Sequence, residues 1–491
     1  MDLDVAFVHP PSVVCSAPLS KVISFYFKYL HKPPPPTQYL IMPMGIFSMA
    51  SFLEDNGFSA RVFNLGLEQI LRGTKDLKKL LTEIEAKIYA IDLHWFVHSD
   101  GAIETARTLK TLYPNSKVVL GGITASFFKE EILLNHSFID AIVVGEGERS
   151  ILDLTKAMLS NKPIEEVKGI AFKEGSKVLM TSPQKPLDIN TLDFTRLNLM
   201  YHYEEYLKVS ISNYIPNKRP SFWLTLFRGC PFSCIYCGGS RDTYTSIFHY
   251  SKIPIIRETE KVVDDIKYLE GRGVKIIRFG QDPEVLGSKY YDKLFGAIRK
   301  EKIDVFAYNE AWNRFPSSEF LTSFKNAFSN VNVAISPDSS LDSIRQFAGR
   351  SGTNEQLLRL SEFLDKKEIL GDVYFLIGLP GETKESCKLI CRLADKLSNT
   401  NYIWIAPTFP FTLDPNSQIA LNPSKYGVKL YFKSFKDYKN AFISPDPIDW
   451  IAHETKEMTR QDIIEMTNYC ASYISSLAWP ALEKKKSFEL L

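Results

Sequence analysis

Three cysteines crowd into eight residues near the middle of this 491-residue chain and constrain it more than any other feature. Cys230, Cys234 and Cys237 are spaced CxxxCxxC, and Gly238 and Gly239 follow them. Three thiolates on one short loop can hold three irons of a cubane cluster, which leaves the fourth iron without a protein ligand. A structural zinc site normally takes four protein ligands, and no fourth Cys or His is adjacent. The spacing therefore favours a [4Fe–4S] cluster over a zinc knuckle or unrelated thiols.

The remaining cysteines are Cys15, Cys387, Cys391 and Cys470, which makes an odd total of seven. In a large chain without a basic N-terminal leader, such a distribution favours metal binding over disulfides. Cys387 and Cys391 are four apart on an expected helix, and two thiols are too few for an auxiliary cluster. We expect all four to serve in core packing.

The first 160 residues alternate short apolar runs with amphipathic stretches. Strands are expected at residues 5–9, 59–64, 88–93, 117–120 and 139–144, with helices at 43–56 and 101–112. This alternation predicts a doubly wound, Rossmann-like parallel sheet. Ligands of such sheets bind beyond the carboxyl ends of the strands. The residues expected there include His9, His94, Gly121, Gly122, Gly145 and Glu146.

The same alternation resumes at residue 221. Strands are expected at 223–227, 274–279, 304–308, 332–335, 373–377 and 402–405. Six such units predict a partial (β/α)₆ barrel with active residues at the carboxyl ends of its strands. The expected domains are an N-terminal domain over 1–160, a connector with a small hairpin over 161–220, the barrel over 221–415 and a mainly helical region over 416–491.

The cysteine segment resembles the radical S-adenosylmethionine (SAM) superfamily, whose signature is this spacing with an aromatic residue before the third Cys, here Tyr236. The resemblance implies that SAM binds the open iron through its methionine amino and carboxylate groups. An electron from the reduced cluster would split SAM into methionine and a 5′-deoxyadenosyl radical, which abstracts hydrogen from an unactivated C–H bond. A reducing partner such as ferredoxin or flavodoxin would supply that electron.

The resemblance also implies SAM contacts at the ends of later strands. The turn at 280–282 stands where the family has a Gly-Gly-Glu-like turn, although its sequence departs from that pattern. A polar residue after the fourth strand commonly meets the SAM ribose or carboxylate. The turn at 378–383 is similar to the family's GxPGET turn near the adenine, and its place after the fifth strand carries the assignment. The candidate SAM contacts are Gly280, Gln281, Asp282, Ser336, Gly378 and Glu382.

The N-terminal domain resembles the cobalamin (B12)-binding domain of B12-type radical SAM proteins. The similarity rests on the helix start at 42–46, the glycine pair at 121–122 and the Gly-Glu-Gly-Glu turn at 145–148, while residues 414–417 resemble the DPGS turn of that class. It implies that strand-end glycines leave room for the corrin or its nucleotide tail. The Asp-x-His-x-x-Gly loop that supplies a cobalt ligand in some B12 proteins is missing after His9.

These features together predict a radical SAM enzyme that uses cobalamin to methylate an unactivated carbon. The alternative enzyme is cobalamin-independent and forms carbon–carbon bonds or rings, or rearranges its substrate, for example a lipid or isoprenoid. A non-enzymatic corrinoid or iron–sulfur carrier would not explain the SAM-site turns. Methylthiolation of tRNA is disfavoured, because only Cys15 lies upstream of the cysteine triad.

Composition bounds the partners. The 59 basic and 57 acidic residues give a net charge of +2, which removes the usual electrostatic argument for nucleic-acid binding. The sequence contains no run of 18 apolar residues, so it predicts no membrane-spanning helix. Its N-terminus lacks the basic start of a signal peptide. We therefore expect a cytoplasmic enzyme. Aromatic residues make up 13% of the chain, which fits a small-molecule or lipid substrate, but a thick core explains it equally well.

Overall fold

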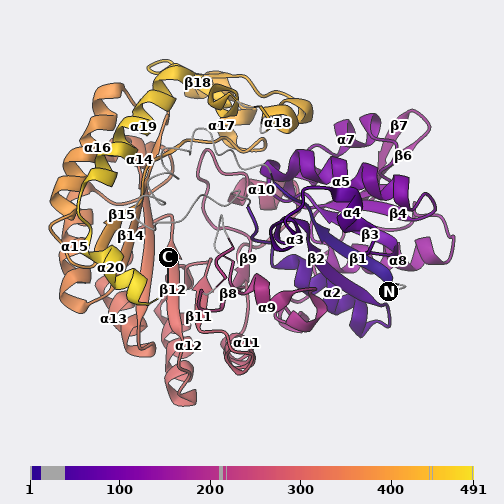
Figure 1. Cartoon of the computed structure of the whole chain (residues 1–491), viewed down its shortest axis with the longest axis horizontal. Coiled ribbons are helices and arrows are strands. Elements are labelled where there is room, and N and C mark those ends of the chain that lie inside the picture. The colour runs from indigo at the N-terminus through magenta and orange to yellow at the C-terminus, as the bar shows by residue number, and fades with distance from the viewer. Residues whose placement is uncertain are drawn as a thin grey trace.

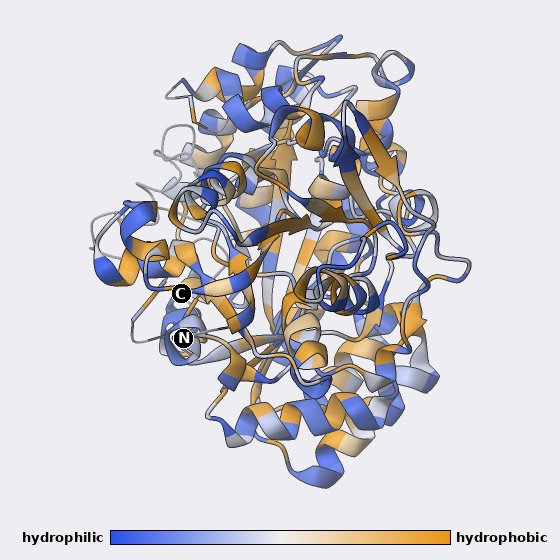
Figure 2. Cartoon of the chain, turned by 90° about the vertical axis from the view of Figure 1, so that its right-hand side faces the viewer, coloured by the Kyte–Doolittle hydropathy of each residue, from blue (hydrophilic) through white to orange (hydrophobic). Residues whose placement is uncertain are grey.

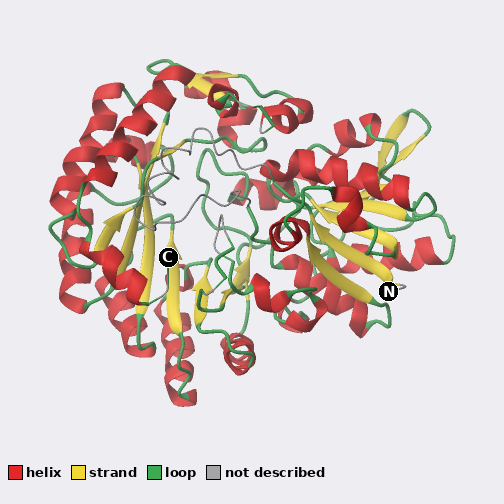
Figure 3. Ribbon diagram, in the orientation of Figure 1, coloured by secondary structure: helices red, strands yellow, loops and turns green. Residues whose placement is uncertain are grey.

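The computed structural model describes residues 3–12, 39–209, 214–216, 218–441, 443–444, 446–488 and 490. Two α/β units lie side by side in it, one with a twisted sheet between helices and one with a curved sheet covered by helices on its outer side (Figure 1 and Figure 3). Cys15, for which we expected a packing role, lies outside the described residues.

The N-terminal sheet has parallel strands in the order β2-β1-β3-β4-β5. Parallel sheets are buried on both faces, which explains why the sequence shows continuous apolar runs here. This confirms the expected doubly wound sheet. Its elements are β1 (Leu3–His9), α2 (Gly45–Asp55), β2 (Ala60–Asn64), α3 (Leu65–Arg72), α4 (Leu77–Leu81), β3 (Ala86–Asp92), α5 (Ser99–Leu112), β4 (Lys117–Gly121), α6 (Ile123–Phe127), α7 (Lys129–Asn135), β5 (Ala141–Val143) and α8 (Glu148–Leu159).

A hairpin follows α8 and lengthens this sheet. Strands β6 (Ile170–Glu174) and β7 (Lys177–Met180) pair antiparallel with β5 and with each other. The expected hairpin therefore belongs to the first sheet, which extends past residue 160, rather than to a free connector. The elements after it are short: α9 (Tyr203–Tyr206) and three-residue 3₁₀ turns.

Alternate residues of β1 pack on opposite faces of the sheet, as strand geometry requires. Ala6 and Val8 face the cluster that contains α5, whereas Val5 and Phe7 face α2. The α2 side continues into the second unit, since the ring centroids of Phe47 and Phe222 lie 5.5 Å apart. The two units therefore share one apolar core, and Figure 2 shows apolar strands enclosed by helices of mixed hydropathy.

The second unit has parallel strands in the order β15-β14-β13-β12-β11-β8, with helices between successive strands. This confirms the expected partial barrel. Its main elements are β8 (Ser221–Leu224), β9 (Phe227–Arg228), α10 (Arg241–Ser246), β10 (Ile255–Ile256), α11 (Thr259–Gly271), β11 (Ile276–Phe279), α12 (Ser288–Glu301), β12 (Phe306–Ala311), α13 (Ser318–Ala327), β13 (Val331–Asp338), α14 (Asp342–Phe347), α15 (Asn354–Lys367), β14 (Leu370–Ile377), α16 (Lys384–Leu397), β15 (Ile403–Ile405) and β16 (Phe409–Pro410).

The C-terminal region covers the barrel. Its elements are α17 (Gln418–Leu421), β17 (Val428–Leu430), α18 (Phe435–Ala441), β18 (His453–Thr455), α19 (Arg460–Ser476) and α20 (Pro480–Ser487). The antiparallel pair of β17 and β18 was not expected in this helical region. Helix α20 packs at β15, and its buried Lys485 forms an ion pair with Asp372 of β14. Across the described residues, no helix is both long and apolar enough to span a bilayer.

Candidate functional site

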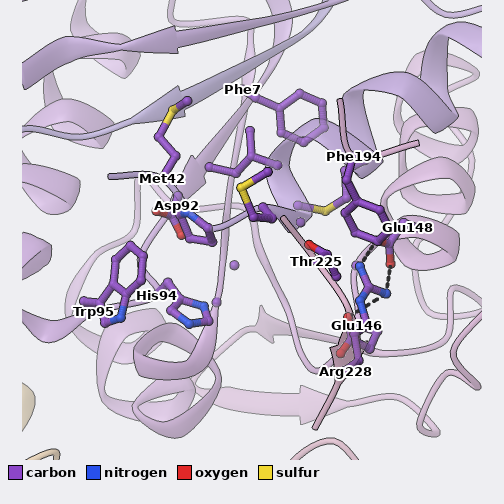
Figure 4. Close-up of a pocket in the computed structure, with 18 of the residues that line it drawn as sticks. Phe7, Met42, Asp92, His94, Trp95, Glu146, Glu148, Phe194, Thr225 and Arg228 are labelled. Carbon is purple, nitrogen blue, oxygen red and sulfur yellow. Dashed lines mark hydrogen bonds and ion pairs between the residues drawn. The ribbon is translucent and has the colours of Figure 1, made fainter. Parts of the chain in front are cut away.

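A cavity of about 570 Å³ opens where the carboxyl ends of the N-terminal strands meet the barrel (Figure 4). Residues of both units line it, and most of the lining is apolar. The first sheet contributes Phe7, Asp92, His94, Gly121, Gly122, Gly145 and Glu146, and the barrel unit contributes Trp223, Thr225, Arg228, Gly280, Gln281, Glu310 and Trp312. The strand-end rule therefore located this cavity correctly.

Five of the six candidate cobalamin residues line this cavity, and His9 does not. The His9 side chain is fully buried, with Nδ1 2.8 Å from Oδ2 of Asp92. Burial lowers the pKa of His9 to about 3, so the imidazole is neutral. The missing Asp-x-His-x-x-Gly motif was the reason to expect no cobalt ligand from this loop. In the structure His9 instead contacts Asp92, the last residue of β3.

Glycine is required at position 122 because the ends of β3 and β4 approach each other closely there. Its φ is +104°, and a Cβ placed there would lie 2.7 Å from both the Cα and the backbone N of His94. Gly121 is different, because its nearest neighbour to such a Cβ is Val143 Cβ at 3.9 Å. Of this glycine pair, only Gly122 is therefore required by the backbone conformation.

The His94 imidazole faces the cavity beside Trp95, with ring centroids 4.8 Å apart (Figure 4). Burial lowers its pKa below the usual value for histidine. The neutral ring therefore keeps a lone pair, which can accept a hydrogen bond or ligate a metal. The nearby His98 differs: it is fully buried, and its Nε2 lies 3.0 Å from the carbonyl oxygen of Tyr39.

The cysteine loop starts directly after β9. Cys234 is buried, and Cys230 and Cys237 are partly exposed. Burial raises the pKa of Cys230, and the neighbouring Cys234 raises it further, whereas Arg350 lowers it. Two N–H groups point at sulfur: Gly239 N donates to Cys237 Sγ at 3.3 Å and Asn313 Nδ2 donates to Cys234 Sγ at 3.3 Å. Three thiols, the Arg350 cation and two N–H groups directed at sulfur therefore lie together at this loop.

The turn at residues 414–417 holds this loop in place. Asp414 Oδ2 accepts from Gly238 N at 2.6 Å, and Asn416 Nδ2 donates to Gly238 O at 2.7 Å. A Cβ on Gly238 would lie 2.4 Å from Asn416 Oδ1, so only glycine fits between them. The turn that resembled the DPGS turn of B12-type proteins therefore packs against the cysteine loop.

The aromatic residue before the third Cys is tied to the barrel. The hydroxyl of Tyr236 donates to Asp338, at the end of β13, and accepts from Arg350 Nε at 2.9 Å. Arg350 also pairs with Asp338 at 2.8 Å. Sequence analysis missed Arg350, because it lies more than a hundred residues after the cysteines and belongs to no recognisable motif.

In the turn at 280–282, where SAM contacts were expected, each residue packs against or hydrogen-bonds the surrounding protein. Gly280 lines the cavity, and a Cβ there would lie 2.9 Å from the Trp223 ring. Oε1 of Gln281 accepts from the backbone N–H groups of Leu226 and Phe227, at 2.7 and 3.0 Å. Asp282 caps the following 3₁₀ turn, and burial raises its pKa to about 7. Of the three, Gly280 and Gln281 reach the cavity.

The other candidate SAM residues surround the ends of β13 and β14. Ser336 Oγ donates to Asp338 Oδ1 at 2.5 Å. Glu382 is fully buried, and its carboxylate accepts from Ser339 Oγ at 2.6 Å and Gly378 N at 3.0 Å. Its oxygens are thus engaged within the turn, so Glu382 shapes the Gly-Leu-Pro-Gly-Glu segment instead of presenting a free carboxylate to a ligand.

Glu310 is a cavity residue that sequence analysis missed. It lies near the end of β12, and its Oε2 accepts from Trp312 Nε1 at 2.8 Å. Burial raises its pKa to about 7. Its position could have been predicted from the sequence, because it is a carboxylate near the end of a mostly apolar barrel strand.

Comparison with known proteins fits this two-part site. The family model described as "Radical SAM superfamily" matches residues 224–394, and the one described as "B12 binding domain" matches residues 37–155. The chain therefore contains a radical SAM domain and a B12-binding domain. The radical SAM domain implies a [4Fe–4S] cluster and SAM as cofactors, and the B12-binding domain implies cobalamin.

An uncharacterized methyltransferase of Pyrococcus horikoshii is 24% identical over 393 residues, which cover 78% of this chain and 81% of that protein. The anaerobic magnesium-protoporphyrin IX monomethyl ester cyclase of Cereibacter sphaeroides is 27% identical over 307 residues, but these are 60% of this chain and 47% of the cyclase. The chain thus spans less than half of the cyclase.

The fold of this radical SAM protein also matches a solved structure. The radical SAM methyltransferase TsrM of Kitasatospora setae, solved with cobalamin and a [4Fe–4S] cluster bound, aligns with a TM-score of 0.66 over 98% of this chain and 90% of its own. At 16% identity this similarity concerns the fold.

The residues of this radical SAM protein suit both cofactors. A cluster needs thiolates and benefits from N–H groups aimed at its sulfurs, and the cysteine loop offers both. Among the described residues, no three His, Cys, Asp or Glu side chains are arranged to hold a single metal ion. A macrocycle needs a wide apolar cleft, and the strand-end glycines border one of about 570 Å³.

Asn313 offers a test of the cluster's surroundings. Its Nδ2 also donates to Gly349 O at 2.9 Å, so both partners are acceptors and the amide orientation is fixed. Hydrogen bonds to cluster sulfurs stabilise the reduced, more negative state. We expect N313A to lower the ratio of reduced to oxidised cluster about tenfold at a given potential, ~59 mV for one electron.

A redox titration followed by EPR spectroscopy measures this shift. The control is N399A, because Asn399 Nδ2 donates to the backbone carbonyl oxygen of Asp395, on the exposed end of α16. An unchanged midpoint potential in N313A would show that the amide does not reach the cluster sulfur.

Proposed function

We propose that this enzyme transfers a methyl group to an unactivated carbon of an apolar small molecule, using cobalamin and a radical made from SAM. One observation carries the proposal: a single cavity is lined both by the strand ends of the B12-binding domain and by barrel residues next to the cysteine loop. A methyl donor and a substrate radical must come within contact distance, and a shared cavity provides that proximity. The relative and the solved structure named as methyltransferases support the same chemistry.

The cluster is assigned to the cysteine loop, which follows the cavity residue Arg228, and cobalamin is assigned to the cavity itself. Cys230, Cys234 and Cys237 would hold the cluster, and the rim formed by His94 and Gly122 would hold cobalamin. When bound, the cluster supplies the electron that cleaves SAM, and methylcobalamin supplies the methyl group. The reducing partner is proposed to be a small electron carrier such as ferredoxin or flavodoxin.

The lining supports an apolar substrate, lipids included. Phe7, Met42, Phe194, Trp223 and Trp312 all face the cavity. Its charged groups are largely paired with one another, as Arg228 is with two glutamates. A lining of this kind excludes water, which protects a carbon radical from side reactions. Glu310 and His94 are the polar groups placed to orient a substrate or cofactor within it.

Anaerobic turnover with methyl-deuterated SAM tests the proposal. With dithionite, hydroxocobalamin and a panel of apolar metabolites, we expect 5′-deoxyadenosine and a product that carries the deuterated methyl group, both read by mass spectrometry. Omitting hydroxocobalamin should abolish the labelled product. If S-adenosylhomocysteine formed without any 5′-deoxyadenosine, the reaction would be an ordinary polar methyl transfer.

Ring formation is the second candidate, and the similarity to the cyclase favours it. The same cavity would then enclose a substrate whose radical closes onto its own carbon skeleton. The assay separates the two functions: a cyclase consumes SAM and gives 5′-deoxyadenosine, but its product contains no deuterated methyl group.

A further inference from the structure

A buried ion-pair cluster joins the B12-binding domain to the segment that leads into the cysteine loop. Arg228 lies on β9, two residues before Cys230. Its Nη1 is 3.0 Å from Oε2 of Glu146 and 3.1 Å from Oε2 of Glu148, and its Nη2 donates to the other oxygen of Glu148. Glu146 lies in the turn between β5 and α8, and Glu148 is the first residue of α8. One guanidinium therefore binds two acidic residues of the other unit (Figure 4).

Three further segments complete the cluster. Ser48 of α2 donates to Glu148 Oε1 at 2.5 Å, and the hydroxyl of Tyr250 donates to Glu146. The ring of Phe194 lies under the guanidinium, with its centroid 5.3 Å from Cζ. Arg228 thus connects α2, the β5–α8 turn, the inter-domain segment and the region after the cysteine loop.

The geometry is suited to fixing positions rather than to adding stability. The side chains of Arg228, Glu146 and Glu148 are only 10%, 14% and 2% exposed. Removing charges from water offsets most of their attraction, so a buried pair contributes little net stability. A guanidinium that bridges two carboxylates nevertheless fixes direction and distance, because its donors form a rigid planar fork.

The turn is shaped to receive this arginine. Gly147 separates the two glutamates, and a Cβ there would lie 2.4 Å from Met49 Sδ, so α2 packs directly on the turn. With α2 on that side, both carboxylates turn toward Arg228. The Gly-Glu-Gly-Glu motif was expected to contact cobalamin. In the structure both of its glutamates instead form ion pairs with Arg228 of the barrel unit.

We propose that Arg228 is a positioning residue that fixes the cobalamin side of the cavity relative to the cysteine loop, with Glu146 and Glu148 as its receptors. The inference rests on the proposed function, because the alignment matters only if both cofactors act in one cavity. Since β9 continues through Gly229 into Cys230, a shift of the arginine moves the start of the cysteine loop. Loosening this connection should therefore disturb the cobalamin side of the cavity, while the cluster, held by its own three thiolates, stays intact.

Two variants test the proposal in the full-length, anaerobically reconstituted enzyme. R228K keeps the charge but loses the fork, and R228Q loses both. We expect the hydroxocobalamin dissociation constant to rise at least tenfold in R228K and further in R228Q, while iron content and the EPR signal of the reduced cluster stay at the wild-type level. R72Q, which removes two ion pairs inside the N-terminal domain, is the matched control and should bind hydroxocobalamin as the wild type does.

Hydrogen–deuterium exchange supplies a readout that does not depend on cobalamin. Peptides covering 43–50, 145–150 and 225–232 should exchange faster in R228Q than in R72Q, because the variant frees segments on both sides. Wild-type exchange in all three peptides of R228Q, or unchanged hydroxocobalamin affinity in both Arg228 variants, would overturn the proposal, as would loss of the cluster in R228K. If the wild type takes up no hydroxocobalamin but R228Q still exchanges faster on both sides, the proposed function fails and the positioning role remains.

Discussion

Replacing Cys230, Cys234 and Cys237 together by alanine is expected to leave the reconstituted protein without a cluster. Wild-type protein should bind about four iron per chain and the triple variant close to none, because three thiolates on one loop are the ligands that such a cluster requires. Cleavage of SAM to 5′-deoxyadenosine should fall to background, since it needs the cluster's electron. Iron analysis with EPR measures the first effect, and chromatography of the nucleoside measures the second.

The control is the double variant C387A/C391A. Both residues lie on α16, where Cys387 is fully buried and its carbonyl oxygen is 3.4 Å from Cys470 Sγ on α19. They pack two helices together, so iron content and SAM cleavage should be normal. A normal cluster in the triple variant, or a lost one in the double variant, would contradict the assignment of the triad.

The strands were predictable because their burial is uniform. Each parallel strand is covered on both faces, so a run of apolar residues identifies it without knowledge of its neighbours. The expected strand at 373–377 corresponds to β14, which begins three residues earlier, at Leu370. The β6–β7 hairpin was expected, but its pairing with β5 was not, because nothing in its own sequence specifies the strand it joins.

The side-chain roles were less predictable than the strand ends. A motif indicates that a residue follows a strand, whereas the turn decides where its side chain points. Glu382 and Gln281 therefore follow the expected strands, but their side chains accept hydrogen bonds from nearby backbone N–H groups. Arg228, Asn313 and Arg350 were missed for a related reason: each acts on a partner at least 79 residues away in the sequence. Only the folded chain shows such pairs.

G122A is expected to weaken cobalamin binding at least tenfold, about 1.4 kcal/mol or more. At φ +104° and ψ 174°, a conformation essentially restricted to glycine, an alanine is strained by roughly 1–3 kcal/mol, and its Cβ would lie 2.7 Å from the His94 backbone. Backbone atoms cannot rotate away, so the ends of β3 and β4 must separate and His94 must move at the cavity rim. Titration with hydroxocobalamin, followed by absorbance, measures the change in affinity.

G121A is the matched control, because it adds the same methyl group one residue earlier. Its Cβ would meet Val143 Cβ at 3.9 Å, which is ordinary contact, so cobalamin affinity should stay within about twofold of wild type. Both variants should keep their iron, since the cysteine loop belongs to the barrel unit. Equal affinity in the two variants would mean that the close approach at Gly122 does not shape the cobalamin site. Loss of iron in G122A alone would instead mean that this strand end also supports the cluster.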